Sequence, residues 1–208
     1  MTFKKIMLVA SMAMAAVAFA APAAQADAPE WWIHTGPETE ETLQGEEGFR
    51  ITGALSSNVV GSALVSGPCN VTLEGTASNV NGMASGTITS GTTTKTCQTP
   101  IPGCHFEPTL DFTIPWSVTG VTVTGEKGIE IGNAKFLEHY NATCQAYGIP
   151  PTVTFTGTMT ALLDEEAPTG ECITFEEHLD DMFINDNPLA PRVNILGTVC
   201  VDAPLTLH

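Results

Sequence analysis

The sequence predicts an all-β fold, an antiparallel β-sandwich or a small barrel of about eight to ten short strands. The first observation behind this prediction is the segment Thr152–Thr160, where threonine occupies every second position and Val153, Phe155 and Met159 lie between. An uninterrupted period of two is typical of a strand with one buried and one solvent-facing side. The second observation is that glycine, asparagine, serine and proline border each such run, as turns require.

The strands are predicted in chain order from this alternation and from the turn residues. Asn81-Gly82 predicts a hairpin turn between Cys69 and Cys97, because glycine accepts the positive φ of tight turns. Prolines mark the boundaries, where a missing backbone donor does least harm. The expected strands begin near Phe49 and continue on both sides of Asn81-Gly82, then at Thr109–Ile114, Trp116–Thr124, Gly128–Phe136, Thr152–Leu163 and Arg192–Val201.

One segment has a helical rather than a strand pattern. Thr174 and Glu177 have capping-box spacing, and Phe175 starts an apolar series at i, i+4, i+7 and i+8 that includes Met182. The pattern predicts one short amphipathic helix near residues 174–183, with an irregular connection as the alternative.

The N-terminal residues are typical of an export signal. Lys4 and Lys5 precede an apolar run, and Ala24-Gln25-Ala26 is a small-residue cleavage site. We therefore expect residues 1–26 to be a signal peptide and the protein to be secreted, either periplasmic or extracellular. No later segment is long and apolar enough to predict a membrane-spanning helix.

The remaining chain divides into a leader and one domain. Residues 27–48 lack periodicity and are expected to form a loosely structured leader, and residues 49–208 are expected to form a single disulfide-stabilised β domain. The leader contains Trp31 and Trp32, whose rings either pack against the domain or form an exposed apolar contact surface. Trp116 is expected in the core.

The cysteines predict disulfides, because their number is even and export places them in an oxidising compartment. A local bridge from Cys97 to Cys104 is expected across a bent, proline-containing loop, and a second from Cys172 to Cys200. A zinc site is the alternative, but the short C-x-x-C spacing of metal ribbons is absent. The six cysteines are Cys69, Cys97, Cys104, Cys144, Cys172 and Cys200.

The charge excludes one class of partner. The sequence contains 23 acidic residues against seven lysines and arginines, a net charge of −16. Such a surface repels phosphate, so nucleic acid is not expected as a partner.

Carboxylates are concentrated between Asp164 and Asp186, a segment without lysine or arginine. Hard cations such as calcium bind several oxygens together, and Asp180, Asp181 and Asp186 are the candidate ligands. A solvated acidic face is the alternative interpretation. With calcium, the fold would suit a carbohydrate-binding β-sandwich, and no other cofactor is expected.

No catalytic motif is present. The histidines form no H-E-x-x-H pair, no serine lies in a G-x-S-x-G turn, and Cys104 beside His105 is expected to be bridged rather than nucleophilic. The many carboxylates leave a secreted hydrolase as an alternative without identifying its acid pair. We expect a protein that is not an enzyme.

The order of several short segments resembles a known family, the small secreted bacterial activators of alkane oxidation. The similarity covers residues 61–144 and includes a cysteine-headed strand, a Pro-Trp strand near mid-chain and a later Thr-Cys. The segments are Cys69–Gly75, Ile88–Gly91, Cys97, Ile114–Gly120, Ile129–Ala134 and Thr143–Cys144.

This resemblance implies a non-enzymatic extracellular protein that helps cells handle water-insoluble hydrocarbon. It would act at the cell surface, in the extracellular matrix or at the oil–water interface, with a hydrophobic surface or a matrix component as its partner. The family supplies no catalytic residue to carry over.

Overall fold

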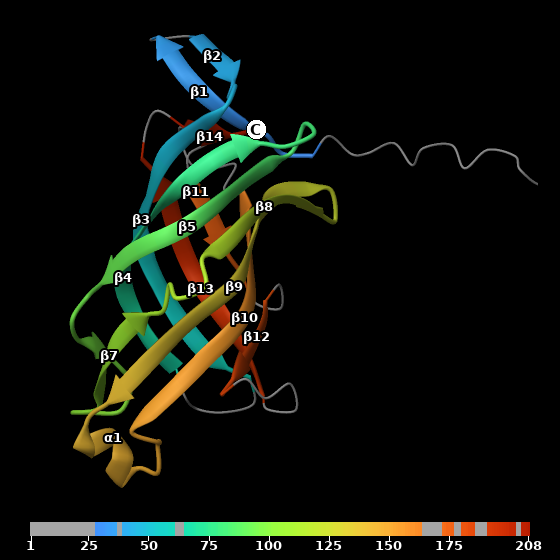
Figure 1. The fold of residues 1–208 in the computed structure, drawn as a ribbon. Helices are drawn as coiled ribbons and strands as arrows, with labels where there is room; N and C mark the ends of the chain where they lie inside the picture. The colour runs from blue at the N-terminus through green and yellow to red at the C-terminus, as the bar shows by residue number, and fades with distance from the viewer. Residues whose placement is uncertain are drawn as a thin grey trace, which may run out of the picture.

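The chain forms an all-β structure with one short helix, as predicted (Figure 1). The computed structural model describes residues 28–36, 39–60, 65–163, 172–176, 180–185, 191–202 and 205–208. The signal peptide expected at residues 1–26 lies outside the described residues. The elements are β1 (Trp31–Gly36), β2 (Thr39–Thr42), β3 (Glu46–Val59), β4 (Val65–Asn79), β5 (Ala84–Thr93), β6 (Cys97–Gln98), β7 (His105–Leu110), β8 (Trp116–Val123), β9 (Glu126–Tyr140), α1 (Ala142–Ala146), β10 (Thr152–Leu163), β11 (Cys172–Phe175), β12 (Asp181–Ile184), β13 (Arg192–Val201) and β14 (Leu205–Leu207).

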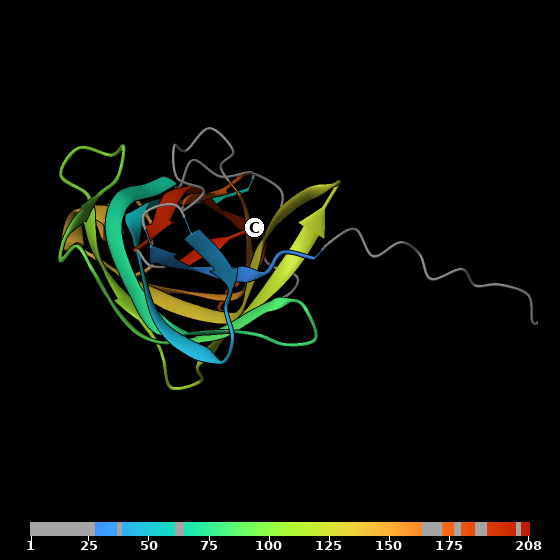
Figure 2. The same ribbon diagram turned by 90° about the horizontal axis from the view of Figure 1, so that it is seen from above.

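The large antiparallel sheet closes on itself to form a barrel. Its strands follow the order β11-β10-β12-β13-β3-β4-β5-β8-β9-β7-β6, and β10 also pairs with β9. This last pairing joins the two sides of the sheet, so that β3, β4, β5, β8, β9, β10, β12 and β13 form a ring. The ring is visible from above in Figure 2. Closure removes the exposed edges that an open sheet of this size would present.

Two positions in the barrel wall are each filled by a pair of short strands. β8 pairs with β9 over Gly128–Gly132 and neighbouring residues, and β7 pairs with the same edge of β9 farther along, over Phe136–Tyr140. In the same way, β12 and β11 follow one another along one edge of β10 and both pair with β13. Each long strand thus has two successive neighbours on one side.

A small second sheet, in the order β14-β1-β2, lies at one end of the barrel. The Trp31 ring stacks on Phe49 with 6.1 Å between centroids, and its indole N–H donates to the carbonyl of Ser85 at 2.9 Å. The side chain of Asn79 accepts from the Trp31 backbone N–H and donates to the carbonyls of Trp31 and Leu43. The sheet therefore closes this end, and α1 lies at the opposite end (Figure 1).

The described part of the predicted leader contains β1 and β2, so the expectation of a loose segment is wrong for these two strands. Trp31 is 1% exposed and belongs to the core, so it is not a surface contact. Trp32 is half-buried, and its ring lies 5.2 Å from that of His208. The partner strand of β1 is β14, from the distant C-terminal part, so no local periodicity could have revealed this pairing.

Several strand predictions are confirmed. β10 and β13 have the predicted bounds, and β4 and β5 form the hairpin that turns at Asn81-Gly82, where both residues have positive φ (54° and 72°). Such a pair of values is typical of the two-residue turns that match strand twist. Trp116 is buried, as expected.

The predicted helix near residues 174–183 is wrong where the structure describes this segment. Cys172–Phe175 and Asp181–Ile184 are strands, and residues 177–179 lie outside the described part. Ile173 and Phe175 are buried while Thr174 is partly exposed, which is strand alternation. Pairing with β10 and β13 on both sides overrides the short helical pattern.

The disulfide prediction is partly confirmed. Cys172 and Cys200 are bonded and lie directly opposite each other on β11 and β13. The Cys97–Cys104 bridge is wrong: Cys97 is bonded to Cys69, and Cys104 to Cys144. The loop between Cys97 and Cys104 does bend back, but its register places Cys97 opposite Phe106. Three disulfides indicate an oxidising environment.

Among the described residues, no helix has the length and apolar character needed to cross a membrane.

Candidate functional site

The interior of the barrel contains a cavity rather than a completely filled core. The cavity volume is about 70 Å³, several times the ~10–15 Å³ that one buried water needs on the same measure. Aliphatic and aromatic side chains form nearly all of its wall. The lining residues are Ile51, Leu55, Ser56, Ser57, Ser66, Cys69, Val71, Leu73, Thr93, Phe106, Pro108, Leu110, Trp116, Ile131, Phe136, Glu138, Met159, Phe175, Ile195 and Val199.

One carboxyl group lies in this apolar wall. Glu138 on β9 is 3% exposed, and its oxygens accept hydrogen bonds from Ser57 Oγ and Ser66 Oγ, each at 3.0 Å. The Tyr140 hydroxyl also donates to Glu138, and it lies 2.9 Å from Ser66 Oγ. We call Ser57, Ser66, Glu138 and Tyr140 the hydroxyl–carboxyl cluster.

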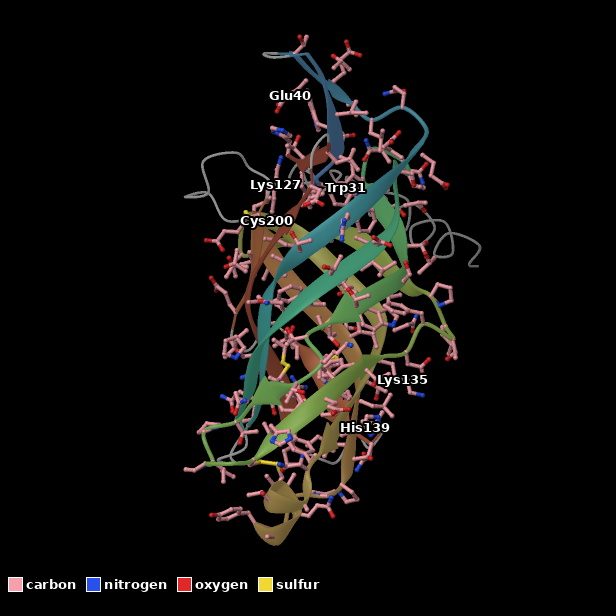
Figure 3. All side chains as sticks on the ribbon, turned by 90° about the vertical axis from the view of Figure 1, so that its left-hand side faces the viewer. Trp31, Glu40, Lys127, Lys135, His139 and Cys200 are labelled. Carbon is pink, nitrogen blue, oxygen red and sulfur yellow. A yellow bond between two sulfur atoms is a disulfide. The ribbon has the colours of Figure 1, made fainter. Side chains whose placement is uncertain are left out.

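The cluster joins strands from different parts of the barrel wall. Ser57 comes from β3, Ser66 comes from β4, and Glu138 and Tyr140 both come from β9. His139 lies between Glu138 and Tyr140 in sequence, and its side chain is exposed. Figure 3 shows it toward the end of the barrel that carries α1, far from Trp31. The cluster thus lies toward the end opposite the small sheet.

A bulge in β9 places Glu138 inside the barrel. Ile129 and Ile131 are buried at odd positions, whereas Ala134, Glu138 and Tyr140 are buried at even positions. The register with β10 shifts at this point, and Asn133 has φ 58°. An extra residue in one strand exchanges the faces of all residues after it, and asparagine tolerates the left-handed conformation. Without the bulge, simple alternation from Ile131 would have turned Leu137 inward.

A second irregularity positions the two serines. The β3–β4 register shifts between Leu55 and Ser57, next to the cis peptide between Gly67 and Pro68. Ser66 and Cys69, on either side of these two residues, both line the cavity. The shift therefore brings Ser57 and Ser66 opposite each other, where both hydroxyls reach the same carboxyl.

Burial dominates the proton affinities in the cluster. Loss of solvation raises the pKa of Glu138, and the hydrogen bonds from Tyr140, Ser57 and Ser66 offset this only in part. Burial raises the pKa of Tyr140 as well, and the neighbouring Glu138 raises it further. Both groups therefore favour their uncharged forms more than they would in water.

The wall beside the cavity is less continuous between β5 and β7. In the described part of the chain these strands share no backbone ladder, and the Thr93 hydroxyl donates to the Pro108 carbonyl at 3.0 Å. Thr93, Pro108 and Leu110 are half-buried and line the cavity. The Cys69–Cys97 disulfide joins β4 to β6 close to this seam.

The two candidate calcium ligands that the structure describes, Asp180 and Asp181, make separate contacts. The buried Asp180 carboxylate accepts hydrogen bonds from the backbone N–H groups of Thr160 on β10 and Ile195 on β13. It lies between β11 and β12, where no strand of the described ranges pairs with these two donors. Asp181 is exposed and pairs with Arg192 at 3.4 Å. Asp186 lies outside the described residues.

Asp180 is therefore a structural carboxylate, and burial raises its pKa to about 6 against the opposing effect of the two backbone hydrogen bonds. Within the described ranges, no three His, Cys, Asp or Glu side chains gather in a way that suits a metal ion.

The expectation that Cys104 is bridged rather than nucleophilic is confirmed by its bond to Cys144. His105 beside it contacts the side-chain amide of Asn141, whose oxygen also caps α1 by accepting from the Cys144 N–H. Among the described lining residues, Glu138 is the sole carboxyl, so this cavity presents no opposed acid pair of the type a glycosidase uses.

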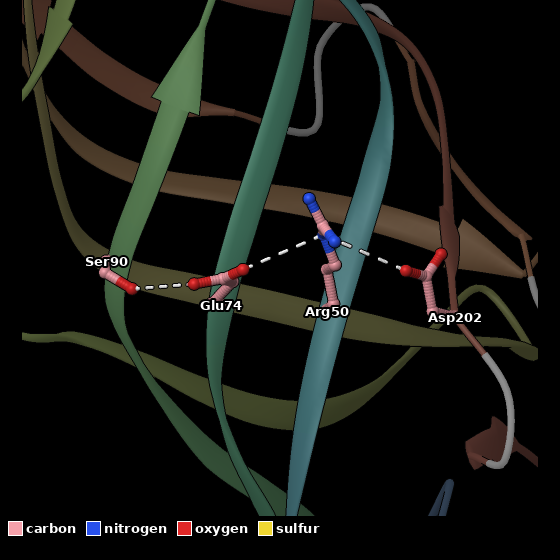
Figure 4. A network of polar contacts seen from close by, with 4 residues as sticks. All are labelled: Arg50, Glu74, Ser90 and Asp202. Atoms are coloured by element: carbon pink, nitrogen blue, oxygen red, sulfur yellow. Dashed lines mark hydrogen bonds and ion pairs between the residues drawn. The ribbon is translucent and has the colours of Figure 1, made fainter.

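On the outer surface, Arg50 joins acidic residues from the neighbouring chain segments (Figure 4). Its Nε lies 3.7 Å from Glu74 and 3.9 Å from Asp202, and Ser90 donates to Glu74 at 3.3 Å. The side chains of Arg50, Glu74 and Asp202 are each about half exposed, so water screens these pairs and they contribute little to stability.

Sequence reasoning missed the hydroxyl–carboxyl cluster because both bulges are invisible in the local pattern. The signals available were Asn133 within a strand and Gly67-Pro68 within another, since both types of residue accompany bulges.

Comparisons with protein-family models, curated proteins and solved structures found no match to this chain.

Proposed function

We propose that this is an exported, non-enzymatic bacterial protein that holds a small water-insoluble molecule inside its barrel. The observation that carries the proposal is the apolar cavity with one polar cluster in its wall, because a concave, mostly apolar space with few convergent polar groups is the usual form of a small-molecule site. The export-type N-terminal sequence and the three disulfides support a location outside the cytoplasm.

The proposal agrees with the hydrocarbon-handling role that the family resemblance implies, but it changes where the contact occurs. Of the two tryptophans considered as possible surface contacts, Trp31 is buried and Trp32 is half-buried. The large apolar residues exposed in the described parts are few: Val80 and Met83 share the β4–β5 turn, and Val60, Ile114 and Tyr147 are separate positions. Binding inside the barrel is therefore better supported than spreading at an oil–water interface or on a matrix component.

The seam between β5 and β7 is the proposed entrance. Two strands joined by a backbone ladder must break several hydrogen bonds to separate. In the described part of the chain, β5 and β7 share no ladder, and a side-chain hydrogen bond from Thr93 to Pro108 joins them. Half-buried lining residues lie on both sides of it, so a ligand that passes between them reaches the cavity directly.

A cavity-filling variant tests the proposal. Leu55→Phe adds volume at a lining position, whereas Thr122→Phe adds the same ring to an exposed position on β8. Titration of octane and octan-1-ol, followed by calorimetry and tryptophan fluorescence, should show saturable binding to wild type and Thr122→Phe and at least tenfold weaker binding to Leu55→Phe. Equal binding by both variants, or no saturable binding by wild type, would contradict a binding role for the interior.

A surface role predicts a different result. A protein that acts at the oil–water boundary should lower the interfacial tension of hexadecane in proportion to its surface coverage, and Leu55→Phe should leave that effect unchanged.

A further inference from the structure

We infer that the barrel selects a ligand with an apolar body and one uncharged hydroxyl or carbonyl oxygen, and that it rejects carboxylates. This inference rests on the proposed binding function and names the chemical class of the ligand. It is carried by the number of hydrogen atoms in the hydroxyl–carboxyl cluster and by the charges in the cavity wall.

The cluster has more oxygen–oxygen contacts than its hydroxyl groups can supply with hydrogens. Ser57, Ser66 and Tyr140 contribute one hydrogen each, but four contacts of hydrogen-bond length join them to Glu138 and to one another. Each contact has a hydrogen of its own only if a fourth hydrogen is present, because otherwise one hydrogen is shared between two acceptors. The fourth hydrogen is present only when the Glu138 carboxyl is protonated.

A protonated Glu138 satisfies every contact. Protonation at Oε2 reverses the contact with Ser66, so that Oε2–H donates to Ser66 Oγ and the Ser66 hydrogen turns to the Tyr140 oxygen. Tyr140 still donates to Oε2, and Ser57 to Oε1. With an ionised carboxyl, Ser66 would have to share its single hydrogen between Oε2 of Glu138 and the Tyr140 oxygen. The desolvation of Glu138, which raises its pKa, acts in the same direction.

The wall offers no compensation for a negative charge. The described lining residues include no lysine, arginine or histidine. Among the described residues, Tyr140 on β9, Ser57 on β3 and Ser66 on β4 are hydrogen-bonded to Glu138, and none of the three carries positive charge. A carboxylate ligand would therefore lose its hydration without gaining an ion pair, which is strongly unfavourable.

An uncharged oxygen has a partner in the same place. Oε1 of Glu138 accepts from Ser57 and retains a second lone pair, and Glu138 itself lines the cavity. A ligand hydroxyl can donate to this position, and a ligand carbonyl can accept from a rearranged cluster hydroxyl. A purely apolar wall would bind an alkane equally well without the cost of burying a carboxyl.

The test uses ligands of equal chain length, octane, octan-1-ol and octanoic acid, with the full chain at neutral pH. Wild type should bind octan-1-ol at least a hundredfold more tightly than octanoate. Acidification below the pKa of free octanoic acid should remove most of this difference, because the ligand then becomes uncharged. Tight octanoate binding at neutral pH would overturn the inference.

Three variants separate the role of Glu138 from a general loss of folding. Glu138→Leu should weaken octan-1-ol binding about tenfold and change octane binding less than threefold. Glu138→Gln keeps an uncharged polar group and should retain octan-1-ol binding within about threefold. Glu130→Gln, at an exposed position of the same strand, is the matched control and should behave as wild type.

The Glu138→Gln variant also tests the protonation state. If Glu138 were ionised, removal of its charge would improve octanoate binding more than tenfold, and this result would overturn the protonated state of Glu138. Infrared difference spectra between wild type and Glu138→Gln at neutral pH should show the carbonyl band of a protonated carboxyl. Failure of octane, octan-1-ol and octanoic acid to bind would instead contradict the proposed function. If Glu138→Leu weakened octane and octan-1-ol binding equally, only the selectivity would be contradicted.

Discussion

Glu138 and Tyr140 lie two residues apart on β9, and the Tyr140 hydroxyl donates a hydrogen bond to the Glu138 carboxyl inside the barrel. Alternation along the strand places both side chains on one face, so a carboxyl and a phenol share a largely apolar environment. This contact connects the bulge at Asn133 to the chemistry of the cavity, because both residues face inward as a consequence of that bulge.

Removal of the Tyr140 hydroxyl should destabilise the fold. Tyr140→Phe deletes a buried donor and leaves Glu138 with fewer partners, for an expected loss of about 1–3 kcal/mol in the free energy of unfolding. Urea denaturation measures this value. Tyr147→Phe, which removes the same hydroxyl from a residue that is 65% exposed, should have no measurable effect. Equal stability of the two variants would show that the cluster does not act as a unit.

The bulge should depend on the residue at position 133. Asn133 has φ 58°, so Asn133→Gly should preserve stability within about 0.5 kcal/mol, whereas the β-branched Asn133→Val should cost about 1–2 kcal/mol. Thr119→Val, at an exposed position of β8, is the control. Unfolding curves and octan-1-ol titrations should change together, because a straightened β9 would turn Glu138 away from the cavity.

Asp180 should make stability depend on pH. Its pKa is about 6 in the folded protein against a usual value of 3.8, so the folded state binds the proton more tightly than the unfolded state. The contribution of this group is therefore greatest below pH 3.8 and is lost as the pH rises through about 6.

Asp180→Asn should remove this dependence. The difference in unfolding free energy between wild type and variant should increase by on the order of 1–3 kcal/mol from pH 7 to pH 4. Glu138 is present in both proteins, so its own titration cancels in the comparison. Parallel stability curves across this range would show that burial does not shift the pKa of Asp180.

The disulfide pairing can be checked directly. Proteolysis without reduction should release cross-linked peptides that contain Cys69 with Cys97, Cys104 with Cys144, and Cys172 with Cys200. The double substitution Cys172→Ser and Cys200→Ser opens a link between residues 28 apart and should cost about 3–4 kcal/mol by loop-entropy arguments. A peptide joining Cys97 to Cys104 would contradict the strand register of β6 and β7.

Local alternation and local turn residues were sufficient to predict two elements, although the β10–β9 and β4–β5 pairings each contain a register shift. β10 carries threonine at alternate positions with Val153, Phe155 and Met159 buried between them, and its predicted bounds are those observed. The β4–β5 hairpin was predictable for the same reason, since Asn81 and Gly82 encode the turn within the segment itself. In both cases the decisive residues are adjacent in sequence.

Features that depend on distant partners were not predictable. β1 pairs with the adjacent β2 and also with the distant β14, and only the second pairing depends on remote sequence. Cys97 is bonded to Cys69, on β4, and not to a residue of its own loop. The candidate site depends on two register shifts, and a shift of one residue reverses which side chains face inward. Leu137 and Glu138 were equally plausible inward residues until the conformation of Asn133 was known.

The pairing of β1 with β14 has a consequence for the order of folding. β1 and β14 lie near opposite ends of the described sequence. Beside them, the backbone N–H and C=O groups of Glu30 and His208 form hydrogen bonds in both directions. Contacts between such remote segments form slowly, because the chain between them must first become compact. We therefore expect the barrel wall to assemble before its cover, which leaves an interval in which the interior is open at that end and can admit a molecule during maturation.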